Sequence, residues 1–476
     1  MLLLRAWYRS REPQLLQMVE VTLDAMARGG IHDQLGGGFH RYSTDEQWLV
    51  PHFEKMLYDQ ALLARAYLEA YQATGLLSYA DVARDIFEYV LRDMRDKTGA
   101  FYSAEDAGAV GKEGEFYVWT IQQVEETLSP KVAAVFNRFY DVTPGGNFEG
   151  GAGILHVGRP LEVFAQEERL SADELRTQLR QAREALLAAR NGRQRPHRDD
   201  KILTDWNGLM IGALAYGARV LDEPRYAEAA REAALFLLTR LRDQDHLLHR
   251  FREGEASIPA FLDDYAFLAW GLLDLYEATF DVRWLKEAQR LTKEMIQLFW
   301  DTKDGGFFFS GERNEQLIAR SKELYDGAVP SGNSVAALTL TQLSVLTMDG
   351  ELREHAQQLF QAFSGPVSQA PHAFPQLLVA LDLWLGPSQE IVIAGDPGAL
   401  PTKQLVRTAA SRFLPRAVVA FHPTGDGAEE VEALMPFLKM QHPLDGQPTV
   451  YICQEYLCNL PTTDAERMVT LLESLR

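Results

Sequence analysis

The hydrophobic residues of this chain recur at helical spacing, and the helices that they predict come in pairs. We expect helices over 13–28, about 51–74, 79–95, 171–190, 207–220, 225–241, 265–280, 284–300, 333–348, 351–363 and 374–385. The first helix of a pair is apolar on most faces and the second is amphipathic, as in 265–280 and 284–300. Two amphipathic helices are followed by similar turns, KTGAFYS and KDGGFFFS, which form an internal repeat.

This array of about twelve helices predicts a mainly α fold, an (α/α)6 toroid, with an open α-solenoid as the competing architecture. The apolar helices would line the inside and the amphipathic ones would wrap the outside. From about residue 388 the pattern changes to short β-rich runs, EIVIAG, AVVAFH and TVYIC. We therefore expect a barrel over 1–387 and a small C-terminal α/β appendage with a parallel sheet over 388–476.

Composition and charge narrow the class of protein. The chain has 476 residues, is 46% hydrophobic and carries a formal net charge of −20, which argues against nucleic acid or an anionic membrane as a partner. No apolar run approaches the ~20 residues of a membrane span, and the three leucines at the start are too few for a signal peptide. Two cysteines, Cys453 and Cys458, exclude a disulfide scaffold and are interpreted as isolated thiols, with a redox or partner-facing pair as the alternative. A cytoplasmic protein is expected.

The stretch 29–59 gathers histidines, acids and glycines, in GGIHDQLGGGFHRYSTDEQWLVPHFEKMLYD. Its first twenty residues fit neither a helix nor a strand, and its apolar side chains argue against disorder. We expect an ordered loop over a polar pocket, followed by a helix that Pro51 opens. His52, which precedes Glu54 and Asp59, is an acid–base candidate, with a satisfied structural histidine as the alternative. The histidine spacing matches no metal-ligand motif, so we expect no metal.

Polar residues also stand where the apolar helices begin. A toroid brings these helix starts to one end, where Asp205 and Asn207, Asp263 and Asp264, and Ser331 and Asn333 would meet. Capping of free backbone N–H groups explains one such residue per helix. The doubled acids and the adjacent aromatic residues favour a sugar ligand, because carboxylates bind hydroxyls and aromatic rings stack on C–H faces. Paired carboxylates can also perform acid–base chemistry.

Two further segments combine charges with aromatic residues. In RQRPHRDDK, residues 193–201, acids and bases alternate, either as a solvated ion-pair loop or as the wall of a pocket for an anionic or polyol ligand. Glu105 and Asp106 follow FYSA and precede EGEFYVW, which forms an acidic and aromatic patch or a surface loop.

Long motifs of this chain resemble the spermatogenesis-associated protein 20 family of thioredoxin-domain-containing proteins. They are the 29–59 stretch, FYSAEDA, EGEFYVW, RPHRDDKILTDWNGLMI, DDYAFL, DGAVPSGNS and the C-terminal CQEYLCNLP. The resemblance implies a six-hairpin barrel similar to N-acylglucosamine 2-epimerases and six-hairpin glycosidases. Full-length members carry an N-terminal thioredoxin-like domain with a cysteine pair. No cysteine precedes Cys453 in this sequence, so we expect the thioredoxin-like domain to be lacking. The resemblance therefore implies no thiol–disulfide activity for this chain.

We therefore expect a carbohydrate-binding, carbohydrate-active barrel with epimerase-like or glycoside-hydrolase-like chemistry, without a cofactor. The expected catalytic residues are His52, Glu54, Asp106, Asp200 and Asp264. The expected substrate-binding residues are His40, Arg41, Trp48, Asp59, Lys201, Trp206, Asn207, Tyr265 and Asn333. An epimerase would use His52 for proton abstraction, whereas a hydrolase would place two of the three aspartates across the bond.

The alternative is a non-catalytic binding or scaffold module that works with a thioredoxin-like domain. Two carboxylates roughly 5 to 10 Å apart across an open cavity would favour hydrolysis. Capped and buried carboxylates without a cavity would favour the scaffold.

Overall fold

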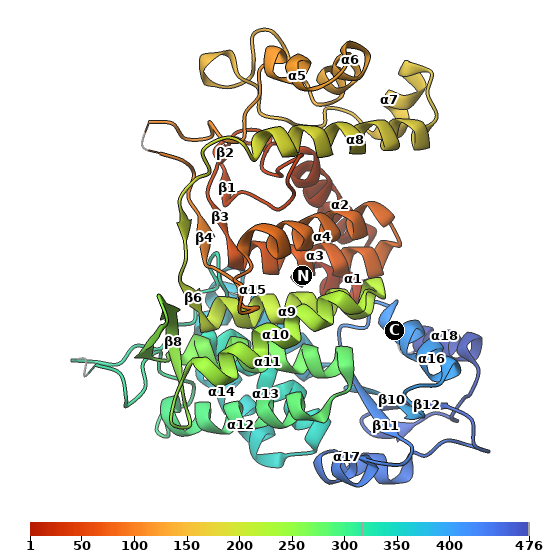
Figure 1. Cartoon of the computed structure of the whole chain (residues 1–476). Coiled ribbons are helices and arrows are strands. Elements are labelled where there is room, and N and C mark those ends of the chain that lie inside the picture. Colours follow the sequence, from red (N-terminus) through yellow and green to blue (C-terminus); the bar gives the residue numbers. More distant parts are fainter. Residues whose placement is uncertain (110, 316–317, 475–476) are drawn as a thin grey trace.

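Six helices form a closed inner ring in the computed structural model, which describes residues 1–109, 111–315 and 318–474 (Figure 1). Each inner helix packs against the next, and the last packs against the first. In ring order they are α1 (Leu2–Ser10), α3 (Leu57–Thr74), α9 (Thr204–Leu221), α11 (Leu262–Thr279), α13 (Gly332–Thr347) and α15 (Pro375–Leu385). The ring closes, so the toroid is confirmed and the open solenoid is wrong.

Five outer helices each pack on the inner helix that precedes them in the chain. They are α2 (Pro13–Arg28), α4 (Leu77–Tyr89), α10 (Pro224–Arg240), α12 (Val282–Phe299) and α14 (Gly350–Gln369). The inner helix α11 is buried along almost its whole length, whereas α12 buries one stripe. This difference confirms that apolar helices line the ring and amphipathic helices surround it. Among the described residues, no helix is both long and apolar enough to cross a membrane.

The inner helices α9 and α11 approach most closely at two glycines. A Cβ atom on Gly271 would lie 2.3 Å from the carbonyl oxygen of Gly208, and one on Gly208 would lie 2.6 Å from the backbone of α11. No side chain fits at either position, because such separations are well inside van der Waals contact. The two glycines therefore allow the backbones of these helices to touch.

The internal repeat has a structural cause. The turn at Phe101 is held by Asn207, whose Oδ1 accepts the Phe101 N–H (2.8 Å) and whose Nδ2 donates to the Phe101 carbonyl (2.9 Å). The turn at Phe307 is held in the same way by Asn333, with distances of 2.8 and 2.9 Å. Both amides are fully buried and donate a further bond to a backbone carbonyl. Each asparagine fastens an outer turn to the first turn of the next inner helix.

An Asn207→Ala variant should lose about 2 to 3 kcal/mol of unfolding free energy, because it leaves the buried N–H and the buried carbonyl of Phe101 without their partner. Urea denaturation followed by tryptophan fluorescence would measure the loss. Asn459→Ala, at an exposed asparagine, is the control and should change the free energy by less than about 0.5 kcal/mol. Equal stability of the two variants would contradict the fastening role.

Between α4 and α9 in the sequence, four helices form a separate layer, which we call the inserted layer. It lies above the ring in Figure 1. Its helices are α5 (Ile121–Thr127), α6 (Pro130–Phe139), α7 (Leu161–Glu168) and α8 (Ala172–Arg190), and they enclose a hydrophobic core of their own. The prediction that 171–190 is one of the toroid helices is wrong. The apolar stripe of α8, at Leu175, Leu179 and Leu186, packs against Phe136 and Phe164 of this layer and not against the ring.

Short strands join this layer to the ring. β1 (Tyr42–Ser43) pairs with β2 (Pro51–His52), and β3 (Lys55–Met56), β4 (Ala104–Glu105) and β5 (Arg198–Asp199) form a three-stranded sheet. A helix starting at Pro51 is therefore wrong, because the chain forms β2 and β3 before α3 begins at Leu57. The outer helix α4 continues into a π-helical turn, η1 (Val90–Met94).

A β-hairpin that the hydrophobic pattern did not predict lies at the end of the ring where α9 begins. It consists of β8 (His246–Arg252) and β9 (Glu255–Pro259), with β6 (Ile202–Leu203) and β7 (Arg242–Asp243) paired to β8. The 3-10 turns η2 (Glu149–Gly151) and η3 (Pro371–Ala373) complete the elements that precede the C-terminal unit.

The C-terminal unit is a four-stranded sheet in the order β11-β10-β12-β13. Its elements are β10 (Gln389–Gly395), α16 (Leu400–Ala410), β11 (Ala417–Pro423), α17 (Ala428–Leu434), η4 (Pro436–Met440), β12 (Thr449–Gln454), β13 (Leu457–Cys458) and α18 (Ala465–Ser474). The α/β appendage is confirmed, but a wholly parallel sheet is wrong. Only β10 and β11 are parallel, because β12 enters on the other side of β10 in the opposite direction.

The two cysteines form a disulfide, so the interpretation as isolated thiols is wrong. Cys453 on β12 lies directly opposite Cys458 on β13, with a Cα–Cα distance of 3.8 Å. The hairpin between these strands brings the two side chains together, which their spacing in the sequence did not indicate.

Candidate functional site

The starts of four inner helices meet at one end of the ring, which we call the toroid mouth. The backbone N–H of Asp205 on α9 donates to Oδ1 of Asp264 on α11 (3.0 Å). Asp263 interacts with the backbone N–H of Gly332 on α13. The ring of Tyr58 on α3 lies edge-on to Trp206 on α9, with 4.8 Å between centroids. The predicted convergence of helix starts is confirmed.

His249 joins the acids of the mouth from strand β8. Its Nδ1 is 3.0 Å from each carboxylate oxygen of Asp264, which also accepts the backbone N–H of Phe261 (2.8 Å). Asp264 is fully buried, Asp205 is 9% exposed and the His249 side chain is 23% exposed. One face of the cluster is thus closed by the protein, while His249 reaches solvent.

Burial and mutual repulsion shift the proton affinities of this cluster. Burial and then the charge of Asp264 raise the pKa of Asp205 to about 7. Burial, followed by the charges of Asp205 and Asp264, raises the pKa of Asp263 well above its ordinary value. Burial alone would lower the pKa of His249, but Asp264 outweighs it and raises this pKa to about 9. At neutral pH the mouth therefore holds an imidazolium at His249 and, at Asp205, a carboxyl group close to its pKa.

A second group of charged residues borders the mouth on the α3 side. Nδ1 of His52 is 2.7 Å from Glu113, and its Nε2 is 3.5 Å from Glu54. Arg41 donates to Glu54 (2.8 Å) and interacts with the hydroxyl of Tyr58, whose ring contacts Trp206. The predicted residues Arg41, His52, Glu54 and Trp206 thus form a continuous rim.

Asp59 belongs to the first turn of α3 and is partly buried. Burial raises its pKa to about 8, with Arg41 opposing and Glu54 reinforcing the shift. Its Oδ2 is buried and has no hydrogen-bond partner within the described part of the chain. Asp59 is therefore a mostly protonated carboxyl group beside the rim at neutral pH.

A cleft of about 750 Å³ lies beside this rim, between the loop at 44–53 and the inserted layer. Glu113, the partner of His52, lines it together with Pro51, Phe53 and Phe148. Its volume is within the range of sites for small molecules. The expected polar pocket next to the 29–59 loop is supported by this cleft.

Three predicted residues lie in surface ion pairs instead of in the cluster. Asp106 is half exposed and 3.4 Å from His197. Asp200 pairs with Arg252 (2.7 Å), and Lys201 pairs with its neighbour Asp199 (2.8 Å). These contacts fit the solvated ion-pair interpretation at the 197–201 end of the segment.

Other predicted residues serve the protein interior. His40 is buried between the rings of Phe53 and Tyr117, and burial holds its pKa well below its ordinary value. Trp48 packs against the core with a positive φ of 62°. The two amides Asn207 and Asn333 hold turns, as described above, so they present no group to a ligand.

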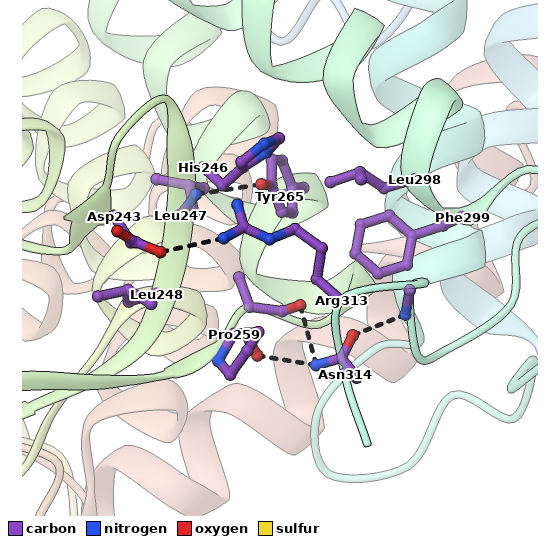
Figure 2. A pocket seen from close by; sticks show the side chains of 12 residues that line it. Asp243, His246, Leu247, Leu248, Pro259, Tyr265, Leu298, Phe299, Arg313 and Asn314 are labelled. Carbon is purple, nitrogen blue, oxygen red and sulfur yellow. Dashed lines mark hydrogen bonds and ion pairs between the residues drawn. The ribbon is translucent and has the colours of Figure 1, made fainter. Parts of the chain in front are cut away.

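Tyr265 faces the outer helices, away from Asp264. Its hydroxyl donates to Glu294 (2.7 Å) and accepts the N–H of Leu247 (3.1 Å). Figure 2 shows it at a cavity beside His246, Phe299 and Arg313. The cavity has a volume of about 30 Å³, which holds a water molecule but no monosaccharide.

Two groups of histidine and acidic side chains bring ligand atoms close enough to share a cation, within the ranges that the structure describes. One is Asp205, His249 and Asp264, and the other is His422, Glu432 and His442 in the C-terminal unit. His249 is protonated at neutral pH and directs that nitrogen at Asp264, so the first group is better suited to holding a proton than a metal.

Sequence reasoning missed His249 and did not select Asp205 as catalytic. Asp205 stood among the helix starts, and its partner Asp264 was selected. His249 lies in the segment DQDHLLHRF, which reads as a turn after a helix, so its place on a strand across the mouth had no periodic signal.

The closed ring and the cluster of acidic side chains at its helix starts define a helical toroid with titratable groups gathered at its mouth. The chain is homologous to spermatogenesis-associated protein 20 of Homo sapiens, with 39% identity over 96% of this chain. The Mus musculus protein of the same name is 37% identical over 96%, and an uncharacterized protein of Caenorhabditis elegans is 32% identical over 96%. The resemblance that the motifs indicated is confirmed. The chain spans 62% of the length of the human and mouse relatives and 66% of the nematode one.

No protein-family model matches the chain. Among solved structures, it is similar to a sugar epimerase from a ruminal bacterium, with a TM-score of 0.47, 11% identity and coverage of 74% and 72% of the two chains. It is also similar to cellobiose 2-epimerase from Bacillus thermoamylovorans, with a TM-score of 0.43, 9% identity and coverage of 97% and 100%. No activity is carried from these structures to this chain.

Proposed function

We propose that the toroid mouth is an acid–base site that acts on a carbohydrate, with Asp205 and His249 as its proton-transferring groups. The observation that carries this proposal is that the two neighbouring groups have different, shifted pKa values. Asp205 has a pKa of about 7 and stands beside an imidazolium with a pKa of about 9. Two titratable groups whose environments separate their pKa values are suited to acid and base roles at one site.

The proposed reaction is epimerisation or isomerisation next to an opened sugar carbonyl. The Asp205 carboxylate would remove the proton from the carbon beside the carbonyl group. Because Nδ1 of His249 is held by Asp264, its Nε2–H would donate to the carbonyl oxygen as charge develops there. The rings of Trp206 and Tyr58 offer apolar faces at the same mouth. In this proposal Asp205 replaces His52 as the group that accepts the proton.

The hydrolase route has less support from the geometry. Asp106 and Asp200 lie in surface ion pairs, and Asp264 is buried with its oxygens occupied by His249 and two backbone N–H groups. The same occupation of Asp264 favours a second candidate, a non-catalytic binding or scaffold module. Capped, buried carboxylates are what such a module would retain.

Sugar-dependent proton exchange tests the first proposal. The full chain would be incubated in D2O with aldoses, ketoses, amino sugars and their phosphates, and loss of the C2–H signal would be followed by NMR. Asp205→Asn should slow exchange by about 10² to 10⁴-fold. The control Asp200→Asn, at a surface ion pair, should leave exchange unchanged. The melting temperature of each variant would show whether it is folded.

The plot of the proton-exchange rate against pH should be bell-shaped. The base form of Asp205 increases above about pH 7, and the acid form of His249 decreases above about pH 9, so the maximum is expected between these values. A thermal-shift screen with the same ligands reports binding without turnover, because a ligand at 100 times its Kd adds about 2.7 kcal/mol. Binding without exchange, or no response to any sugar, would favour the binding or scaffold module.

A further inference from the structure

Three side chains from separate elements of the C-terminal unit converge on one point. They are His422 on strand β11, Glu432 on helix α17 and His442, which follows η4. Each offers a ligand atom within 4.8 Å of the other two. His422 is buried, Glu432 is partly buried and His442 is exposed, so the group opens to solvent on one side. None of these residues belongs to the toroid mouth.

The backbone fixes both histidine rings. Nδ1 of His422 is 2.6 Å from the carbonyl oxygen of Gln441, and Nε2 of His442 is 2.9 Å from that of Lys439. A carbonyl oxygen only accepts, so each of these ring nitrogens carries the hydrogen. The other nitrogen of each ring is then free to coordinate a metal. This arrangement, with one ring N–H held by a backbone carbonyl, is the usual support of a metal-bound histidine.

The free nitrogen of His422 faces a carboxylate oxygen. Its Nε2 is 3.2 Å from Oε1 of Glu432. If the His422 ring is neutral and carries its hydrogen on Nδ1, then its Nε2 and the Glu432 Oε1 are both acceptors. Two acceptors at this distance are unfavourable unless a cation lies between them. That cation is either an additional proton on His422 or a metal ion shared with His442.

We propose that His422, Glu432 and His442 form a site for a divalent transition metal, with Zn²⁺ as the expected ion. Two imidazoles and one carboxylate are a ligand set that zinc uses, with a water molecule in the fourth position. At Zn–N bond lengths of about 2.0 Å, the ligand atoms of a tetrahedral site stand about 3.3 Å apart. His422 and Glu432 already have this spacing. The exposed His442 offers its ligand atom within 4.8 Å of both.

The metal would fasten α17 and the segment after η4 to strand β11. That segment includes Gln441, whose side-chain Nε2 lies 3.6 and 3.5 Å from the sulfurs of Cys453 and Cys458. Occupation of the site would therefore hold Gln441 against the disulfide. The proposed role is structural and independent of the toroid mouth.

Metal titration of the full chain, purified without a histidine tag and stripped with chelator, tests the site. Isothermal titration with ZnCl2 should show one equivalent bound, and CoCl2 should give the visible absorption of tetrahedral Co²⁺. His442→Ala removes an exposed ligand, so the protein should remain folded, and zinc affinity should fall at least about 100-fold. Glu432→Gln keeps the shape of the side chain and should also weaken binding. His372→Ala, at an exposed histidine on η3, should bind as the unaltered protein does.

Three results would overturn the proposal. One is the absence of zinc binding at micromolar concentration, which would mean that a proton bridges His422 and Glu432. Another is equal zinc affinity of His442→Ala and the unaltered chain. The third is zinc binding that is lost in Asp264→Asn but retained in His442→Ala, which would place the ion at the toroid mouth.

Discussion

In an Asp264→Asn variant, the pKa of His249 is expected to fall from about 9 to near the ordinary histidine value of about 6.5. Burial opposes the imidazolium, and the Asp264 carboxylate at 3.0 Å is the main group that stabilises it. The side-chain resonances of His249, followed by NMR between pH 5 and 10, would report the change. Asp243→Asn is the matched control, since this carboxylate on the neighbouring strand pairs with Arg313. Its His249 should still titrate near pH 9.

The same ion pair makes stability depend on pH in a defined direction. The pKa of His249 is raised on folding, so its contribution is fully present below about pH 6.5 and is lost as the pH rises through 9. A difference of about two and a half units corresponds to roughly 3 kcal/mol. The unaltered protein should lose more stability than Asp264→Asn over this interval. Parallel pH dependence in the two proteins would contradict the ion pair.

Asp33→Asn should destabilise the protein by about 3 to 5 kcal/mol, because it leaves two buried cations without their counter-charge. Asp33 lies 2.8 Å from Lys55 and accepts two bonds from Arg190, at 2.8 and 2.9 Å. Lys55 and Arg190 are almost completely buried. Burial alone would raise the pKa of Asp33, but Arg190 and Lys55 hold it well below its ordinary value. Its contribution is therefore present above about pH 4 and is lost as the pH falls further.

Urea denaturation of Asp33→Asn and of Asp173→Asn would test the buried network. Asp173 is 94% exposed and pairs with Arg176, so its loss should cost less than about 1 kcal/mol. Because Arg190 ends α8 and Lys55 lies on β3, hydrogen exchange should also show earlier opening between the inserted layer and the ring. A loss below 1 kcal/mol in Asp33→Asn would show that the two cations find other partners.

Local patterns were sufficient to predict the ring. Inner helices such as α11 are buried on nearly all faces, and their sequences are apolar on nearly all faces. The acids at the helix starts were also visible, since Asp205 and Asp264 precede long apolar runs. Their convergence then followed from the architecture alone, because parallel inner helices must begin at the same end.

Partners that are distant in the sequence could not be predicted. Within the 29–59 stretch, the charge of Asp33 is balanced inside the protein by Arg190, which is 157 positions away in the sequence. Charged side chains in a loop look the same in the sequence whether they bind a ligand or each other. His249 was missed for a related reason, since a short strand that crosses the mouth has no helical periodicity. Its significance depends on Asp264, which belongs to another element.

The contact between Gly208 and Gly271 has a consequence for acidity. Gly208 follows Asp205 by less than one helical turn, and the backbones of α9 and α11 touch at this glycine pair. Any side chain there would act as a wedge, move Asp205 away from Asp264 and weaken the repulsion that raises the pKa of Asp205. The close approach of α9 and α11 at these two glycines therefore contributes, together with burial, to the raised pKa of Asp205.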